Sequence, residues 1–279
     1  MPELPEVEST IIDLKYFIGS SIKTIKLNRD NLRYSIPKNI PLITKNTKIQ
    51  SINRIAKYII INLNNSFSLI VHLGMSGRLK AHKLVSFSDI NYQEKHDHVE
   101  IILKDKFKIV FNDPRRFGLF DIIQTRNIKR HKYFKNLGLD PLDKNFNSQY
   151  LYNKIKNSNS SIKSLLLNQR IVSGIGNIYA CEILFISKIS PFRRGNQISK
   201  EKVFLLVRYI KKILKLAIRQ GGTTIRDYKS VSGELGKYQN NFLVYNKDGY
   251  YIKINNKKAI IVRKIQSGRS TYYCPYLQR

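Results

Sequence analysis

Ile59-Ile-Ile-Asn-Leu-Asn-Asn-Ser-Phe-Ser-Leu-Ile-Val71 contains two short apolar runs, Ile59–Leu63 and Ser68–Val71, on either side of a polar turn. β-Branched residues favour strands, and Asn and Ser favour the turns between them. The pattern recurs at Val99–Leu103 and Lys108–Phe111. Several short strands at this spacing are typical of a sandwich or barrel, which we expect for the first part of the chain.

Helical periodicity flanks this region on both sides. The apolar residues between Ser9 and Phe17 are spaced as in a short amphipathic helix that ends at Gly19. Residues 126–146 combine Gly138, Pro141 and polar residues, and we interpret them as an interdomain linker. Beyond them the periodicity predicts helices at Gln149–Lys156, Ile162–Leu167, Ile178–Ile186 and Lys200–Arg219, and then a β-hairpin with strands Tyr250–Ile254 and Ala259–Val262 and a basic tip.

The chain has 279 residues and a strongly basic composition, with 50 Lys and Arg against 19 Asp and Glu and a net charge of +31. A basic surface of this size attracts a polyanion, most commonly nucleic acid. The chain is also rich in Lys, Asn and Ile, as an A·T-biased genome would produce. Charge alone therefore does not decide whether the protein binds nucleic acid.

Two cysteines, Cys181 and Cys274, are too few for a disulfide framework. The acidic N-terminus does not resemble a secretory signal, and the apolar runs fall well short of the ~18 residues that cross a bilayer. We therefore expect a cytoplasmic protein in a reducing compartment, with no membrane partner.

The N-terminus, Met1-Pro2-Glu3-Leu4-Pro5-Glu6-Val7-Glu8, contains a candidate nucleophile. Removal of Met1 exposes the secondary amine of Pro2, and an α-amino group titrates near ~8 whereas a lysine titrates near ~10.4. Addition of this amine to a sugar aldehyde gives an iminium with no N–H to lose, so the cation persists as an electron sink for β-elimination. The alternative is that Pro2 serves only Met1 processing.

The N-terminal octamer resembles that of bacterial formamidopyrimidine-DNA glycosylase, a base-excision-repair enzyme that removes 8-oxoguanine and ring-opened purines. The resemblance implies an α+β fold with an N-terminal β-sandwich (1–125) that includes an N-terminal helix, the linker (126–146), a helix–two-turn–helix domain (147–237) and a C-terminal β-hairpin finger (238–279). Further motifs follow in the family's order at Arg54–Tyr58, His72–Gly77, Lys95–Val99, Asn112–Gly118, Leu139–Leu142, Gly174–Ala180, Gly221–Thr224 and Ser267–Pro275.

The resemblance implies a bifunctional glycosylase and abasic-site (AP) lyase, and it assigns four catalytic residues. Pro2 attacks C1′ of the damaged nucleotide, and Glu3 protonates the sugar or the leaving group. Lys57 contacts the lesion's phosphate and assists β-elimination; the alternative is a solvated lysine at a strand end, and only the Arg54-x-x-Lys57-Tyr58 frame favours the catalytic role. Arg269 enters the minor groove and supports δ-elimination. A carboxylate at Glu3 could instead cap the first helix, and Glu6 is a weaker candidate for organising the site.

Three residues are expected to fill the space that an extruded base leaves in the duplex. Met75 fills it flexibly, Phe117 wedges between base steps and Arg115 bonds to the orphaned partner base. His96, like Arg115, occupies a position at which the family contacts DNA.

Lys163 and Asn177 are expected to bind backbone phosphates beside the glycine loop Gly174–Ile178. Asn159 stands where the family often has another basic residue, so the chain departs from the family's pattern at this position. Residues 221–238 are expected to form the loop that covers the extruded base. The partner implied is double-stranded DNA with oxidised bases or abasic sites, in the bacterial nucleoid. Because a single nicking site needs no symmetric partner, we expect a monomer.

The finger departs from the family's pattern, in which two Cys-x-x-Cys pairs bind zinc. Cys274 is present, but Leu277 stands three residues later and Ile252–Lys258 contains neither Cys nor His. Because a structural zinc needs four ligands, we expect no zinc and no other cofactor. The pair His96 and His98 lacks further ligands and does not indicate a metal site. Apolar residues are expected to hold the hairpin instead, namely Ile252, Ile254, Ile260, Val262, Tyr272 and Tyr273.

Two other functions remain open. The related endonuclease VIII type removes oxidised pyrimidines, but it typically has glycine where this chain has Leu4. A DNA-binding protein that has lost catalysis would fit the altered finger, although the presence of Pro2, Glu3 and Lys57 argues against it.

Overall fold

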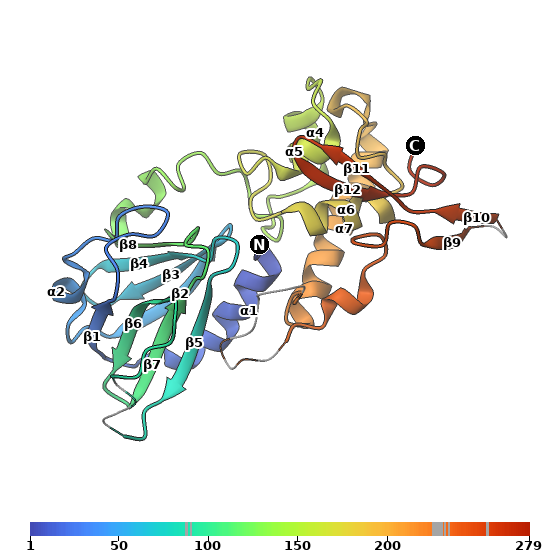
Figure 1. Cartoon of the computed structure of the whole chain (residues 1–279). Helices are drawn as coiled ribbons and strands as arrows, with labels where there is room; N and C mark the ends of the chain where they lie inside the picture. The colour runs from blue at the N-terminus through green and yellow to red at the C-terminus, as the bar shows by residue number, and fades with distance from the viewer. Residues whose placement is uncertain (87–88, 90, 225–230, 232, 234, 255–256) are drawn as a thin grey trace. The chain divides into compact units, whose positions relative to one another are not determined.

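The computed structural model describes residues 1–86, 89, 91–224, 231, 233, 235–254 and 257–279. These residues form two compact units (Figure 1): the first comprises 1–135 and 220–239, and the second 136–219 and 240–279. The sequence predicted boundaries that follow chain order, whereas in the structure 220–239 returns to the first unit. Hydrogen bonds account for the difference, because the Val231 N–H donates to the Asp13 carboxylate at 3.1 Å and the Ala81 N–H donates to the Val231 carbonyl at 3.2 Å.

The first unit contains two antiparallel sheets with strand orders β1-β6-β7-β5 and β2-β3-β4-β8. The predicted sandwich is confirmed, and the two runs quoted first form its β3–β4 hairpin, in which Ile60 pairs with Ile70. The strands are β1 (Ile22–Leu27), β2 (Ile49–Ile55), β3 (Tyr58–Leu63), β4 (Phe67–His72), β5 (Arg78–Lys83), β6 (Asp97–Leu103), β7 (Phe107–Asn112) and β8 (Leu119–Gln124).

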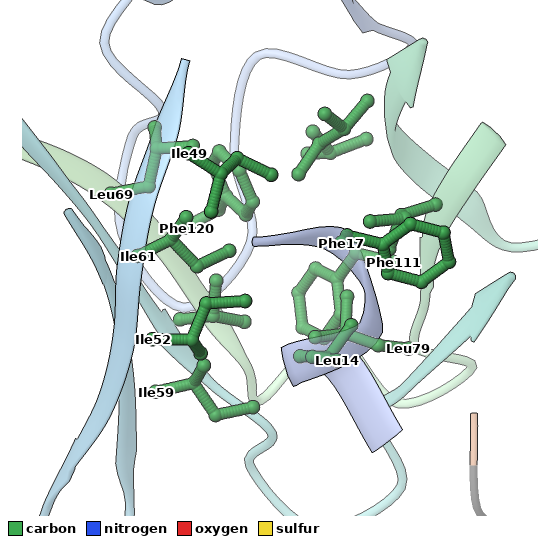
Figure 2. Packing of buried hydrophobic residues seen from close by; sticks show 14 of the residues in the cluster. Leu14, Phe17, Ile49, Ile52, Ile59, Ile61, Leu69, Leu79, Phe111 and Phe120 are labelled. Carbon is green, nitrogen blue, oxygen red and sulfur yellow. The ribbon is translucent and has the colours of Figure 1, made fainter. Parts of the chain in front are cut away.

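Alternate strand residues from both sheets build one hydrophobic core (Figure 2). On β3, Ile59 and Ile61 belong to this core, as the two-residue period of a strand requires. Phe111 and Phe120, from different sheets, place their ring centroids 6.4 Å apart. The core also receives α1 (Leu4–Leu14) and the 3₁₀ turn η1 (Lys15–Phe17), and the remaining short elements of the unit are α2 (Ile40–Thr44) and η2 (Thr125–Arg130).

Helix α1 begins at Leu4 and not at Ser9, where the periodicity placed its start. Glu3 is the N-cap and forms a capping box with Glu6, whose Oε2 accepts the Glu3 N–H at 2.8 Å. Pro5 lies in the first turn, where its missing N–H costs no helical hydrogen bond. The capping role considered for Glu3 is therefore present, and it fixes the residue that follows Pro2.

The second unit combines helices with two β-hairpins, and its four predicted helices agree with the structure to within a residue or two. The predicted single hairpin is instead two, because Ile261 separates β10 from a further strand that pairs with β12. The elements are α4 (Ser148–Ile155), α5 (Ile162–Leu167), α6 (Asn177–Ile186), η3 (Gly195–Gln197), α7 (Lys200–Arg219), β9 (Tyr251–Ile254), β10 (Lys257–Ile260), β11 (Val262–Gln266) and β12 (Arg269–Tyr273); η4 (Tyr238–Asn241) spans the boundary between the units. Across the described ranges, none of the helices is both long and apolar enough to cross a membrane.

Replacing Leu69 by Ala is expected to lower the free energy of unfolding by about 2–5 kcal/mol, because this fully buried side chain would leave a cavity between the sheets. Leu42→Ala is the matched control, since Leu42 is 80% exposed and should change stability by less than about 0.5 kcal/mol. Urea denaturation of both variants measures the difference. Equal effects would contradict the assignment of the core.

Candidate active site

The N-terminal segment places Pro2 and Glu3 in buried positions at the start of α1, whereas Met1 is 48% exposed. Glu6 organises this segment more than the sequence suggested. Its Oε2 accepts the Glu3 N–H, and its Oε1 accepts the Thr223 N–H at 2.8 Å and the Thr223 hydroxyl at 2.9 Å. One buried carboxylate thus holds both the backbone beside Pro2 and the start of the segment 221–238.

Gly222 allows this segment to approach α1 closely. Its φ of +74° lies in the left-handed region, and a Cβ there would come within 2.9 Å of Glu6 Oε1. Most of the predicted lesion-covering loop, residues 225–230, 232 and 234, lies outside the described residues.

Lys57 lies in the two-residue turn between β2 and β3 and is only 7% exposed, so it is not a solvated lysine. Arg54 explains the Arg-x-x-Lys spacing of this motif. Its guanidinium donates to Glu8 Oε2 at 2.5 Å and to the Ala56 carbonyl at 3.2 Å, while Ala56 adopts a left-handed φ of 54°. The salt bridge attaches the turn that contains Lys57 to helix α1, which follows Pro2.

His72, at the end of β4, is a further candidate that the sequence analysis did not single out. Burial lowers its pKa to about 4, with further contributions from the charges of Lys57 and Arg33. Its Nδ1 accepts the Gly74 N–H at 3.0 Å, so the neutral ring presents Nε2–H as a donor. A neutral donor beside two cations suits a phosphate group. Its position in the His72–Gly77 motif was the signal available in the sequence.

The structure brings together the two loops that contain Met75, Arg115 and Phe117. Met75 is 39% and Phe117 44% exposed, and the Arg115 guanidinium lies over the Phe117 ring at 5.0 Å. The backbones touch, because a Cβ on Gly74 would come within 2.4 Å of the Phe117 carbonyl carbon. The three residues expected to act as a wedge therefore lie on two touching loops and are exposed.

Asp113 joins these loops, and in the sequence it is only one residue of the Asn112–Gly118 motif. Its fully buried carboxylate accepts the Ser76 hydroxyl at 2.6 Å on Oδ1 and the Gly118 N–H at 2.7 Å on Oδ2. The Ser76 Oγ in turn accepts the Arg115 N–H at 3.1 Å. Only the tertiary structure shows that residues 76 and 113 are neighbours.

His96 lies next to these loops, with a left-handed φ of 75° and a carbonyl that accepts the Asp113 N–H at 3.1 Å. His98 is buried and its Nε2 lies 2.9 Å from the Asp113 carbonyl oxygen, which satisfies the ring without a metal. The two histidines therefore have different environments. His96 is half-buried, and His98 supports the loop Asp113–Gly118.

In the second unit, Lys163 and Asn177 do not face outward as expected. Lys163 is 1% exposed, and its ammonium donates to the Ser270 carbonyl at 3.1 Å and to the Thr271 hydroxyl at 2.7 Å. The Asn177 amide donates to the same Ser270 carbonyl at 2.9 Å. The Lys163 ammonium thus donates inside the unit, and the expected phosphate contact stays a prediction. Arg269, the residue before Ser270, is exposed at the start of β12.

An apolar cluster holds the finger, as expected, but with different members. Ile260 is 40% exposed, whereas its neighbours Ala259 and Ile261 are buried, because alternate residues of a strand face the same side. Of the other expected members, Tyr272 belongs to the cluster, and Ile252 and Ile254 pack against it. Val262 is half-buried, and the Tyr273 ring packs on the Phe192 ring with centroids 5.1 Å apart. The buried members are Cys181, Phe185, Val244, Ala259, Ile261, Tyr272 and Cys274.

The residues of the finger do not fit the zinc site of the family's pattern. Cys274 is fully buried among apolar side chains. Within the described part of the chain, His, Cys, Asp and Glu nowhere gather in a group of three or more that could hold a metal. The thiol of Cys274 therefore acts as a small apolar side chain.

Comparison with known proteins assigns the family. The profile of the formamidopyrimidine-DNA glycosylase N-terminal domain matches residues 1–120, and that of the formamidopyrimidine-DNA glycosylase H2TH domain matches residues 137–229. The chain belongs to the formamidopyrimidine-DNA glycosylase family. It is similar to the formamidopyrimidine-DNA glycosylase of Roseobacter denitrificans, at 42% identity over all of both chains, and to that of Wolbachia pipientis, at 42% identity over 98% of each.

Solved structures of the family give the same result for the fold. The chain superposes on a Lactococcus lactis Fpg mutant in complex with Fapy-dG-containing DNA with a TM-score of 0.90, at 32% identity and full coverage of both chains. It superposes on the Lactococcus lactis Fpg with abasic-site DNA with a TM-score of 0.89, at 32% identity and 99% coverage of each.

The lowered pKa of His72 predicts a specific loss of stability in acid. The folded-state pKa lies below the unfolded value. The contribution of neutral His72 to the free energy of unfolding is therefore complete above about pH 6.5 and is lost as the pH falls toward about 4. From about pH 7 to about pH 5, the native chain should lose about 2 kcal/mol more unfolding free energy than His72→Gln. Urea denaturation at both pH values measures this, and parallel losses would contradict a buried neutral imidazole.

A second prediction concerns the finger of this glycosylase. Because its hairpins are held by the apolar cluster, we expect purified protein to contain no stoichiometric zinc, and treatment with a chelator should leave the melting temperature unchanged. Elemental analysis and a thermal melt with and without the chelator provide the test. One zinc per chain, or a fall in melting temperature on chelation, would contradict it.

Proposed function

We propose that this chain excises oxidised purines such as 8-oxoguanine and formamidopyrimidines from DNA through a Schiff base on Pro2, and then cuts the strand as an AP lyase. The observation that carries the proposal is the N-terminus itself, where Pro2 lies in a buried position directly before the capped start of α1, so that removal of Met1 would leave a secondary amine there. Relatives that are formamidopyrimidine-DNA glycosylases match this chain over the whole length of both proteins, which supports the substrate class.

The proposed chemistry uses residues of the first unit. The Pro2 nitrogen attacks C1′ and the base leaves as Glu3 supplies a proton, after which the opened sugar is an iminium. Loss of a C2′ proton then breaks the C3′–O bond, with the iminium as the electron sink. Lys57 and His72 present a cation and a neutral donor to the phosphate of this nucleotide.

The remaining steps need groups that reach into DNA. Arg115, Phe117 and Met75 form an exposed cluster of the composition needed to fill the space of an extruded nucleotide, with His96 beside it. Arg269 is proposed to support δ-elimination, in which loss of a C4′ proton breaks the C5′–O bond. The net charge of +31 supplies affinity for the backbone of double-stranded DNA, in the bacterial nucleoid.

Retention of Met1 is the sharpest test of the nucleophile. A form that keeps Met1, or carries an N-terminal tag, should bind a duplex containing 8-oxoguanine but give no covalent adduct on borohydride reduction, because the proline nitrogen is then an amide. The mature chain should be trapped efficiently. Equal trapping of both forms would move the nucleophile elsewhere in the chain.

The same assay separates the alternatives. A duplex with an oxidised pyrimidine serves as the matched substrate, and a stronger adduct there would favour the endonuclease VIII type. Binding to both duplexes with no adduct on either would indicate a DNA-binding protein without catalysis.

Lys57→Met should retain binding while slowing strand cleavage.

A further inference from the structure

We propose that Lys163 is a positioning residue for Arg269, fixing the β11–β12 hairpin so that the arginine is held where δ-elimination requires it. The proposal rests on the role proposed above for Arg269. It assigns to Lys163 a function inside the protein in place of a contact with DNA, and it explains why a charged side chain is buried here.

The buried ammonium of Lys163 bonds to the two residues that directly follow Arg269. It lies 3.1 Å from the Ser270 carbonyl oxygen and 2.7 Å from Thr271 Oγ1, and Thr271 is fully buried. Hydrogen bonds to a charged donor are stronger than neutral ones, and removing such a donor leaves buried acceptors unsatisfied. This pair of contacts therefore fixes β12 at its first residues.

Two further contacts hold the same short segment. Asn177, at the first position of α6, donates to the Ser270 carbonyl, so this oxygen accepts from two helices at once. On the opposite strand, Gln266 donates to Ser161 Oγ at 2.8 Å and accepts the Thr271 hydroxyl at 3.2 Å. Polar anchors thus lie on both strands beside the turn.

Arg269 is the residue whose position these anchors determine. It pairs with Gln266 across the hairpin, directly after the turn residues Ser267 and Gly268, which have left-handed φ values of 49° and 71°. Its own side chain is exposed, so neighbouring side chains do not fix its backbone. In a finger whose residues do not fit a zinc site, the apolar cluster holds the base of the hairpins and the Lys163 contacts hold the end that contains Arg269.

The experiment measures the ratio of δ- to β-elimination products from a duplex with an abasic site, because both products come from the same enzyme in the same reaction. Lys163→Met keeps the length of the side chain and removes its charge and donors. We expect this ratio to fall about tenfold, as a small displacement of a reacting group does, while the yield of the borohydride-trapped adduct changes less than about twofold. Lys215→Met, which removes one exposed charge of the same unit, is the control and should leave both unchanged.

Thr271→Val is the second variant, in case Lys163→Met does not fold. It removes the hydroxyl that accepts from the Lys163 ammonium while it keeps the side-chain volume. The ratio of δ- to β-elimination products should fall by a smaller factor than in Lys163→Met. Arg269→Ala tests the underlying role and should lower the ratio most.

The outcomes are distinguishable. If Arg269→Ala leaves the product ratio unchanged, the proposed function of Arg269 is wrong. If Arg269→Ala lowers the ratio but folded Lys163→Met and Thr271→Val do not, the positioning role is wrong and the proposed function stands. A parallel loss of trapping and of both products in Lys163→Met would also overturn the inference, because it would show a general structural role.

Discussion

Buried carboxylates that accept backbone N–H groups hold the irregular segments of this strongly basic protein. Glu6 binds N–H groups at the start of α1 and at Thr223, and Asp113 binds the N–H of Gly118 in the loop Asp113–Gly118. Glu182 binds three consecutive N–H groups, at 243–245, over 2.8–3.0 Å, although burial raises its pKa. Each carboxylate satisfies backbone donors that no helix or strand would otherwise pair.

These carboxylates also hold the segments that contain the proposed catalytic residues. Pro2 must be at the chain terminus to act as an amine, and a chain terminus is ordinarily poorly ordered. The capping box and the Thr223 contacts remove that freedom, because Glu6 fixes the backbone one residue after Pro2. Arg54 does the same for the turn that contains Lys57 through its salt bridge to Glu8.

The basic side chains separate into two groups with different roles. Most are exposed and provide a general attraction for a polyanion, which salt weakens. A few are buried and directed at specific acceptors, as Lys163 is at the Ser270 carbonyl. The charge total therefore overstates the number of lysines available to DNA, and burial decides to which group a lysine belongs.

The sequence by itself predicted the helices of the second unit, four strands of the sandwich and the loss of zinc ligands, and it suggested Pro2 as the nucleophile, because period, residue type and the low basicity of an N-terminal amine are local properties. The start of α1 was misplaced because its capping box uses buried acidic residues that the apolar pattern does not count. Only the tertiary structure decided which polar groups face inward. Lys57 and Lys163 look like any other lysine in a chain with 50 basic residues, and both are buried. The tautomer of His72 and the return of 220–239 to the first unit likewise depend on partners remote in sequence. The physical reason is that burial and hydrogen bonding are properties of the neighbours that folding brings together, which residue type and spacing do not specify.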